Sequence, residues 1–140
     1  MDRAFVDTNV LVYLFDDTSP RKRDTVRKLV AARGVAGALV VSTQVLLELH
    51  VVLTRKRRPP MAPADAEELV RTLAEWTVVQ TDVGLVLAAL ARARKETIST
   101  WDALIVEAAR VAGCRTLLTE DLQAERVFDD VTVVNPFAKA

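Results

Sequence analysis

The sequence contains few of the residues that would commit it to several common classes of protein. Only 5% of its residues are aromatic although 51% are hydrophobic, so its core must be aliphatic. One cysteine, Cys114, excludes a disulfide framework within the chain and suits a cytoplasmic location. No apolar run reaches the roughly 20 residues that a membrane-spanning helix needs, and no signal peptide is expected.

The net charge gives no general attraction to nucleic acid, because Lys+Arg and Asp+Glu number 19 each. Any such attraction must come from local clusters. The basic run Arg55–Arg58 follows Glu48 on one predicted helix, where it suits either the helix C-terminus or a phosphate-binding rim. The basic groups at 21–23 and 92–95 are more typical of solvated helix faces.

Short apolar runs alternate with helical patterns, which favours an α/β fold with a parallel sheet in a single domain over residues 1–140. The expected strands are Ala4–Val6, Ala38–Val41, Thr77–Val79, Arg115–Leu118 and Val131–Val134. The expected helices are Val10–Phe15, Arg21–Arg33 ended by Gly34 and Gly37, a helix capped by Ser42 or Thr43 and reaching about Arg57, Ala64–Glu75, a helix capped by Asp82 and reaching Lys95, and Thr100–Val111 ended by Gly113.

Four acidic residues stand among neighbours that favour burial, namely Asp7, Glu48, Asp102 and Asp121. If they converge, each pair repels by roughly 3 kcal/mol at ~5 Å and an effective dielectric of ~20. A divalent cation would offset this repulsion, because hard cations prefer oxygen ligands. Asp7 and Asp121 follow predicted parallel strands, and ligands bind beyond the carboxyl ends of such strands. The four acids can reach that edge and suggest metal-dependent phosphodiester chemistry.

Each acid also has a purely structural interpretation. Asp7 suits a helix N-cap, and Glu48 suits a side chain that reaches the surface or pairs with an arginine. Asp102 fits the third helical position of a capping box. Glu120 competes with Asp121 for the fourth acidic position, and the sequence does not separate the two.

Other reactive residue types lack partners in the sequence. His50 lies two residues from Glu48, on a different helix face, and is expected to be a surface or core histidine. Trp101 beside Asp102 can stack on a base, although a packing role is expected. Cys114 has no cysteine or histidine at ligand spacing, so an inert core position is expected.

The segments VDTNVLVYLF, STQVLLELHVV, STWDALIVEAA and LLTEDL together resemble the PIN-domain ribonucleases, and more narrowly the VapC-type toxins of bacterial toxin–antitoxin pairs. The resemblance implies a three-layer α/β/α fold with a five-stranded parallel sheet. It also implies a catalytic metal site of four acids with accessory polar groups. The acids are Asp7, Glu48, Asp102 and Asp121, and the accessory groups are Thr8, Asn9 and Thr119.

The function that this resemblance implies is a Mg²⁺- or Mn²⁺-dependent endoribonuclease that hydrolyses RNA. A small antitoxin protein is the implied partner, and a homodimer is a further implication. Two alternatives stay open, namely a PIN-type RNA-processing nuclease that is not a toxin and a non-catalytic receiver-like interaction module. A phosphoaspartyl phosphatase with Asp7 as nucleophile is disfavoured, because Asn9 stands where a DxD-type site has its second acid.

Overall fold

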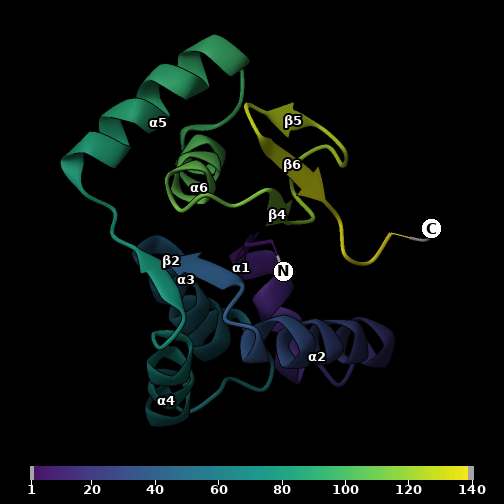
Figure 1. The fold of residues 1–140 in the computed structure, drawn as a ribbon. Coiled ribbons are helices and arrows are strands. Elements are labelled where there is room, and N and C mark those ends of the chain that lie inside the picture. Colours follow the sequence, from purple (N-terminus) through teal and green to yellow (C-terminus); the bar gives the residue numbers. More distant parts are fainter. Residues whose placement is uncertain (1, 139–140) are drawn as a thin grey trace.

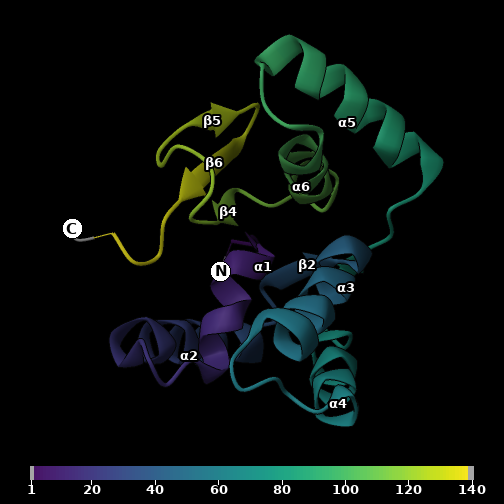
Figure 2. The same cartoon turned by 180° about the vertical axis from the view of Figure 1, so that it is seen from behind.

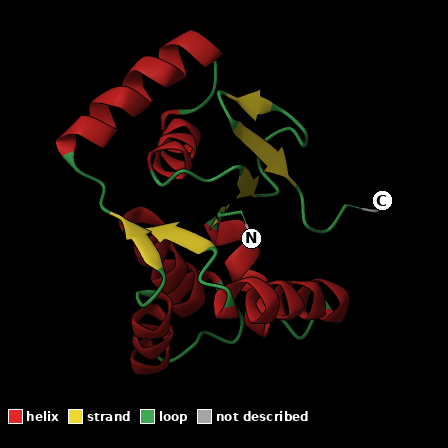
Figure 3. Ribbon diagram, viewed as in Figure 1, coloured by secondary structure: helices red, strands yellow, loops and turns green. Residues whose placement is uncertain are grey.

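A six-stranded sheet forms the centre of the computed structural model, which describes residues 2–138. Its strand order is β3-β2-β1-β4-β6-β5. The parallel strands are β1 (Ala4–Val6), β2 (Leu39–Ser42), β3 (Thr77–Val79), β4 (Thr116–Leu118) and β6 (Val131–Val134). The edge strand β5 (Val127–Phe128) is antiparallel to β6. The predicted five-stranded parallel sheet is confirmed, with one short antiparallel strand added (Figure 3).

Helices cover both faces of this sheet (Figures 1 and 2). One face carries α1 (Thr8–Leu11), its 3-10 continuation η1 (Val12–Phe15), α2 (Pro20–Val35), α3 (Thr43–Val51), the π-helical turn η2 (Val52–Lys56) and α4 (Pro63–Leu73). On the other face α6 (Thr100–Val111) packs against β2, β4 and β6, and α5 (Val83–Glu96) packs on α6. The expected three-layer α/β/α architecture is therefore confirmed.

Helix starts follow the sequence closely, because short polar side chains cap the first free backbone N–H groups. The capping side chains are those of Asp7, Ser42, Asp82 and Ser99. The sequence had left Ser42 and Thr43 as alternative caps, and Ser42 is the cap observed. Gly113 follows α6 with a φ of 72°, a left-handed conformation that a glycine adopts without steric cost.

Four details differ from the sequence prediction. The helix expected over Val10–Phe15 begins at Thr8, and its part from Val12 to Phe15 is a 3-10 helix. Gly34 lies inside α2 and does not end it, so the helix runs on to Val35 before Gly37 turns the chain with a φ of 67°. The helix after β2 is not uniform to Arg57, because it becomes the π-helical turn η2 at Val52. The strand β5 was missed, since two residues are too few to display a strand period.

The core is aliphatic, as the composition predicts, and lies on both faces of the sheet. The central strands contribute side chains without solvent exposure, including Phe5, Val40 and Leu117. On α2, Val26 is buried and Leu29 packs against the core. None of the helices in the described part of the chain is long and apolar enough to cross a membrane.

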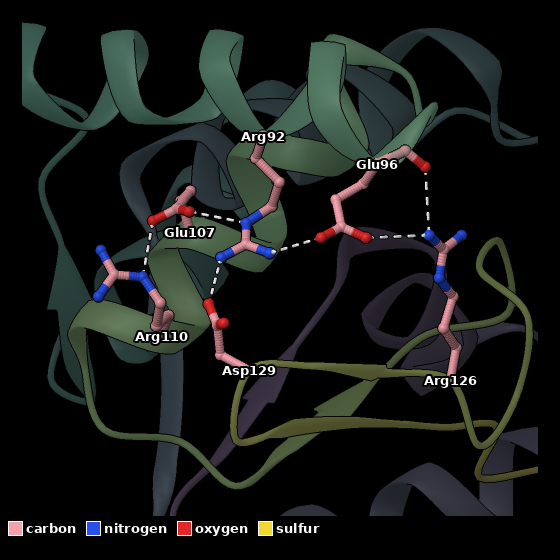
Figure 4. Close-up of polar contacts among 6 residues, drawn as sticks. All are labelled: Arg92, Glu96, Glu107, Arg110, Arg126 and Asp129. Carbon is pink, nitrogen blue, oxygen red and sulfur yellow. Dashed lines mark hydrogen bonds and ion pairs between the residues drawn. The ribbon is translucent and has the colours of Figure 1, made fainter.

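An ion-pair network fastens the β5–β6 edge to α5 and α6 (Figure 4). Its members are Arg92, Glu96, Glu107, Arg110, Arg126 and Asp129. The Nε of Arg92 donates to Glu107 at 2.7 Å, and its Nη2 pairs with Asp129 in the turn between β5 and β6. The side chain of Arg92 is only 10% exposed, so the prediction of a solvated face is wrong for this residue.

Candidate active site at the carboxyl edge of the sheet

Asp7 lies immediately after β1 and caps α1. Its Oδ1 accepts a hydrogen bond from the backbone N–H of Thr8 at 2.7 Å, and its Oδ2 accepts one from the hydroxyl of Thr119 at 2.8 Å. Its own backbone N–H donates to the carbonyl of Leu118 at the end of β4. The side chain is buried. The N-cap interpretation is therefore confirmed, and it fixes this carboxylate at the carboxyl edge of the two central strands.

Burial raises the pKa of Asp7 from 3.8 to about 6. Hydrogen bonds from Thr119 and Thr8 oppose this rise, while the negative charges of Asp121 and Glu48 add to it. Both of these acids thus lie close enough to Asp7 to repel its ionised form. A positive charge among them would reverse the effect and favour the carboxylate.

Glu48 lies one turn into α3 and is tied to Asp7 through Thr8. Its Oε2 accepts from the hydroxyl of Thr8 at 3.0 Å, and its Oε1 accepts from the Nε2 of Gln44 at 2.9 Å. Thr8 therefore donates to both acids, through its backbone to Asp7 and through its side chain to Glu48. The exposure of α3 is greater than its sequence suggests, because Leu47 beside Glu48 is 69% exposed.

The loop after β4 distinguishes Glu120 from Asp121. Glu120 forms an ion pair with Lys22 of α2 at 2.9 Å, whereas Asp121 contributes to the raised pKa of Asp7. The hydroxyl of Thr119 accepts the backbone N–H of Asp121 at 3.1 Å. This difference favours Asp121 over Glu120 for the fourth acidic position. The side chain of Lys22 is 37% exposed, which agrees with the predicted solvated face, and its ammonium also pairs with the acid-bearing loop.

Asn9 joins the two loops that carry these acids. Its Nδ2 donates to the Oγ1 of Thr119 at 3.1 Å and to the Oδ2 of Asp7 at 3.4 Å, while its Oδ1 accepts the backbone N–H of Glu120 at 3.2 Å. The three groups named as accessory from the family resemblance thus form one hydrogen-bonded set with the acids. Their bonds hold Asp7 and the loop after β4 in a fixed relationship.

Asp102 lies at the same edge of the sheet but stands apart from the other acids. Its backbone N–H donates to the Oγ of Ser99 at 3.0 Å, which is the first half of the predicted capping box. At the end of α6 the carbonyl of Ala112 accepts a hydrogen bond from Arg3, which lies just before β1. The end of α6 therefore lies at the amino edge of the sheet, and its start, with Asp102, lies toward the carboxyl edge. Within residues 2–138 no hydrogen bond or ion pair joins the carboxylate of Asp102 to the other three acids.

The part of the chain that the structure describes contains no three Asp, Glu, His or Cys side chains already spaced to bind one metal ion. The donor chemistry nevertheless fits a hard divalent cation, because every candidate ligand is a carboxylate. Beside Glu48, the Oε1 of Gln44 is buried without a hydrogen-bond donor among the described residues. Asp121 is exposed and Asp102 is half-buried, so their side chains are the ones free to rotate toward a bound cation.

The remaining candidates lie outside this set. Trp101 is 67% exposed, so the prediction that it packs is wrong. Cys114 is confirmed as an inert core residue, because burial raises the pKa of its thiol to about 11. Arg58 donates to the carbonyls of Arg55 and Arg57, which favours the helix C-terminal interpretation of the basic run. His50 is half-buried and lines an apolar groove between α3 and α4.

The solved structures that share this fold include three that are each less than 25% identical in sequence. The sarcin–ricin loop cleaving toxin VapC20 of Mycobacterium tuberculosis is 24% identical with a TM-score of 0.65, covering 84% of this chain and 89% of its own. A toxin–antitoxin complex from Klebsiella pneumoniae is 17% identical with a TM-score of 0.69, covering 96% and 98%. DNA-bound VapBC from Salmonella typhimurium is 18% identical with a TM-score of 0.65, covering 95% and 97%.

Among curated protein sequences, none matches this chain significantly. The structural relatives and the sequence motifs nevertheless agree on one family. The family model of the PIN domain matches residues 4–129, which is most of the chain, and the protein therefore belongs to the PIN domain family.

Proposed function

We propose that this chain is a Mg²⁺- or Mn²⁺-dependent endoribonuclease and that it acts as the toxin of a toxin–antitoxin pair. The observation that carries the nuclease proposal is the buried carboxylate of Asp7, which lies in the field of Glu48 and Asp121 at the carboxyl edge of a parallel sheet. Membership of the PIN domain family supports the same activity.

The chain's own residues orient the acids before any substrate binds. Thr8 donates to Asp7 and to Glu48, and Thr119 donates to Asp7 while it accepts from the loop that carries Asp121. Side chains held in this way need little reorganisation when charge develops on a bound phosphate, which is the condition for efficient electrostatic catalysis.

Asp7, Glu48 and Asp121 are the residues that would hold the metal, and Asp102 would join them by rotation of its side chain. A bound Mg²⁺ or Mn²⁺ supplies a coordinated water of lowered pKa and stabilises negative charge on the phosphate. Such chemistry requires no side-chain nucleophile. This agrees with the position of the single histidine, His50, which lies in the groove between α3 and α4.

The toxin role is supported by the structural relatives, which are described as a toxin and as toxin–antitoxin complexes. We propose an antitoxin whose extended tail places an arginine against the acids, because a guanidinium binds carboxylates through two hydrogen bonds. Such a partner would inhibit cleavage by occupying the site. A homodimer is part of the same proposal and is supported by exposed apolar side chains on α5, at Val83 and Leu87.

Cleavage of single-stranded RNA by the purified protein, with Mg²⁺, Mn²⁺ or EDTA, tests the nuclease. Metal-dependent cleavage is expected, and Asp7→Asn should reduce it by several orders of magnitude while the protein stays folded. Asp130→Asn, which neutralises an exposed acid in the turn between β5 and β6, is the matched control and should cleave normally. Undiminished cleavage by Asp7→Asn would refute the site, and metal-independent cleavage would refute the mechanism.

Expression in bacterial cells tests the toxin. Growth arrest is expected, and co-expression of the product of a small adjacent reading frame should relieve both the arrest and the RNA cleavage. If the purified protein cleaves RNA but its expression leaves growth unchanged, the alternative of an RNA-processing nuclease would be favoured over the toxin.

A further inference from the structure

A small pocket lies between the start of α2 and the segment that follows β6. It has a volume of about 130 Å³ and is lined by Arg21, Lys22, Thr25, Pro136, Phe137 and Ala138. In both ribbon views the segment after β6 descends on the side of the molecule where α2 lies (Figures 1 and 2). We call it the basic–aromatic pocket.

Lys22 connects this pocket to the acid-bearing loop. Its Nζ pairs with Glu120 at 2.9 Å and lies 4.8 Å from the ring centroid of Tyr13 and 5.1 Å from that of Phe137. The two rings meet edge to face with their centroids 5.1 Å apart. One ammonium group thus links Phe137 to Glu120, the residue next to Asp121, so the pocket adjoins the loop that carries Asp121.

An RNA strand that approaches the acids is repelled by them, so its neighbouring phosphates need cations close by. The charge of Lys22 is already shared with Glu120. Arg21 is exposed, and its guanidinium makes no hydrogen bond or ion pair with any described residue. Arg21 is therefore the cation in the pocket that an incoming phosphate can engage, and a guanidinium matches phosphate geometry through two hydrogen bonds.

Phe137 supplies the second recognition element. Its ring lines the pocket and is held in place by Tyr13 and Lys22. Bases of single-stranded RNA stack on such rings without regard to sequence, and cations beside the ring bind the backbone. We infer that the basic–aromatic pocket binds single-stranded RNA next to the cleaved bond, with a phosphate on Arg21 and the adjoining base on Phe137. This inference rests on the proposed nuclease function.

RNA binding, measured under conditions that prevent cleavage, tests this inference. The full chain carrying Asp7→Asn is titrated in EDTA against a fluorescent single-stranded oligoribonucleotide, and anisotropy gives the Kd at several salt concentrations. Arg21→Ala should weaken binding about threefold to tenfold and reduce the salt slope by about 0.7, the value for one phosphate contact on a single strand. Lys28→Ala removes an exposed cation from the same helix and should have a much smaller effect.

The ring is tested with a matched pair in the same background. Phe137→Leu should weaken binding about tenfold, since it removes a stacking surface, whereas Phe137→Tyr should bind as the parent does. In chains with Asp7 intact, Arg21→Ala should raise the KM for RNA cleavage more than it lowers kcat. Thermal melts check that each variant is folded, and Arg21→Ala alone still tests the pocket if Phe137→Leu unfolds.

Equal effects of Arg21→Ala and Lys28→Ala would overturn the inference, because the contribution would then be diffuse charge. Unchanged RNA affinity in Arg21→Ala would also overturn it. An acidic peptide that binds the parent chain and loses affinity in Arg21→Ala would then assign the pocket to a protein partner. If the unsubstituted chain neither binds nor cleaves RNA, the proposed function itself fails, which is a distinguishable result.

Discussion

The hydroxyl of Thr8 donates a hydrogen bond of 3.0 Å to the carboxylate of Glu48, a residue 40 positions further along the chain. The backbone N–H of the same threonine donates to Asp7. One residue therefore sets the relative orientation of two acids, the N-cap of α1 and a residue within α3. This makes Thr8 a positioning residue. The role of its hydroxyl can be tested with a substitution that keeps the shape of the side chain.

We predict that Thr8→Val lowers RNA cleavage strongly, because Glu48 loses a bond that orients it, although the shape of the side chain is kept. The stability cost should be only about 1 kcal/mol, the usual net contribution of one hydrogen bond. Thr8→Ser retains the hydroxyl and should retain most of the activity. Cleavage rates and denaturant unfolding of the two variants provide the measurement, and equal activity in both would contradict the role.

The raised pKa of Asp7 predicts how the stability of the metal-free protein depends on pH. With a pKa of 3.8 when unfolded and about 6 when folded, this group binds a proton only in the folded state between those values. Stability should therefore rise as pH falls through 6 toward 4, by up to about 3 kcal/mol from this residue. Asp7→Asn should remove that contribution. The free energy of unfolding of both proteins is measured with denaturant in EDTA at pH 7, 6 and 5. The same dependence on pH in wild type and Asp7→Asn would contradict the prediction.

The loop after β4 gives a prediction about the fourth acid. Asp121→Asn should weaken Mn²⁺ binding more than Glu120→Gln, because Asp121 acts on Asp7 whereas Glu120 is bound to Lys22. Glu120→Gln should instead loosen the contact with α2. Isothermal titration with Mn²⁺ compares the two variants, and a larger loss of affinity in Glu120→Gln would reverse the assignment.

The ion-pair network at the far side of α6 should matter for stability and not for chemistry (Figure 4). Glu107→Leu removes the buried partner of Arg92, whose side chain is itself mostly buried, and should cost roughly 3–5 kcal/mol. Asp129→Ala removes an exposed partner and should change stability little. Denaturant unfolding measures both, while RNA cleavage by the folded Asp129→Ala should match the parent. Equal destabilisation by the two variants would contradict the central place of Glu107.

The sequence predicts the sheet and most helix starts well, because these depend on local signals such as the caps at Ser42 and Asp82. It also identifies Asp7 and Glu48 through the cost of placing a charge among apolar neighbours. The same criterion would select Glu107, within LIVEAA, which the structure pairs with two arginines. Only the fold separates the two cases, since it pairs Glu107 with arginines and places Asp7 and Glu48 on either side of Thr8.

The tertiary partners of charged surface residues could not be predicted in this way. Lys22 and Arg92 sit in basic helix segments that are typical of solvated faces, yet their partners lie 98 and 15 residues away along the chain. Such pairings depend on which segments the fold brings together. The exposure of Trp101 has the same origin. Whether another element covers the start of α6 depends on the fold and cannot be read from the local sequence.

Thermal melting with and without divalent metal tests the central claim most directly, because it requires no knowledge of the substrate. A ligand that binds only the folded state stabilises it by about 2.7 kcal/mol when present at 100 times its Kd. Wild type should therefore melt several degrees higher in millimolar Mg²⁺ or Mn²⁺. The gain should be smaller in Glu48→Gln and Asp102→Asn, and unchanged in Glu75→Gln, which alters an exposed acid after α4. If wild type shows no metal-dependent shift and Glu48→Gln and Asp102→Asn simply lose stability, the acids are structural and the protein is not a metal-dependent nuclease.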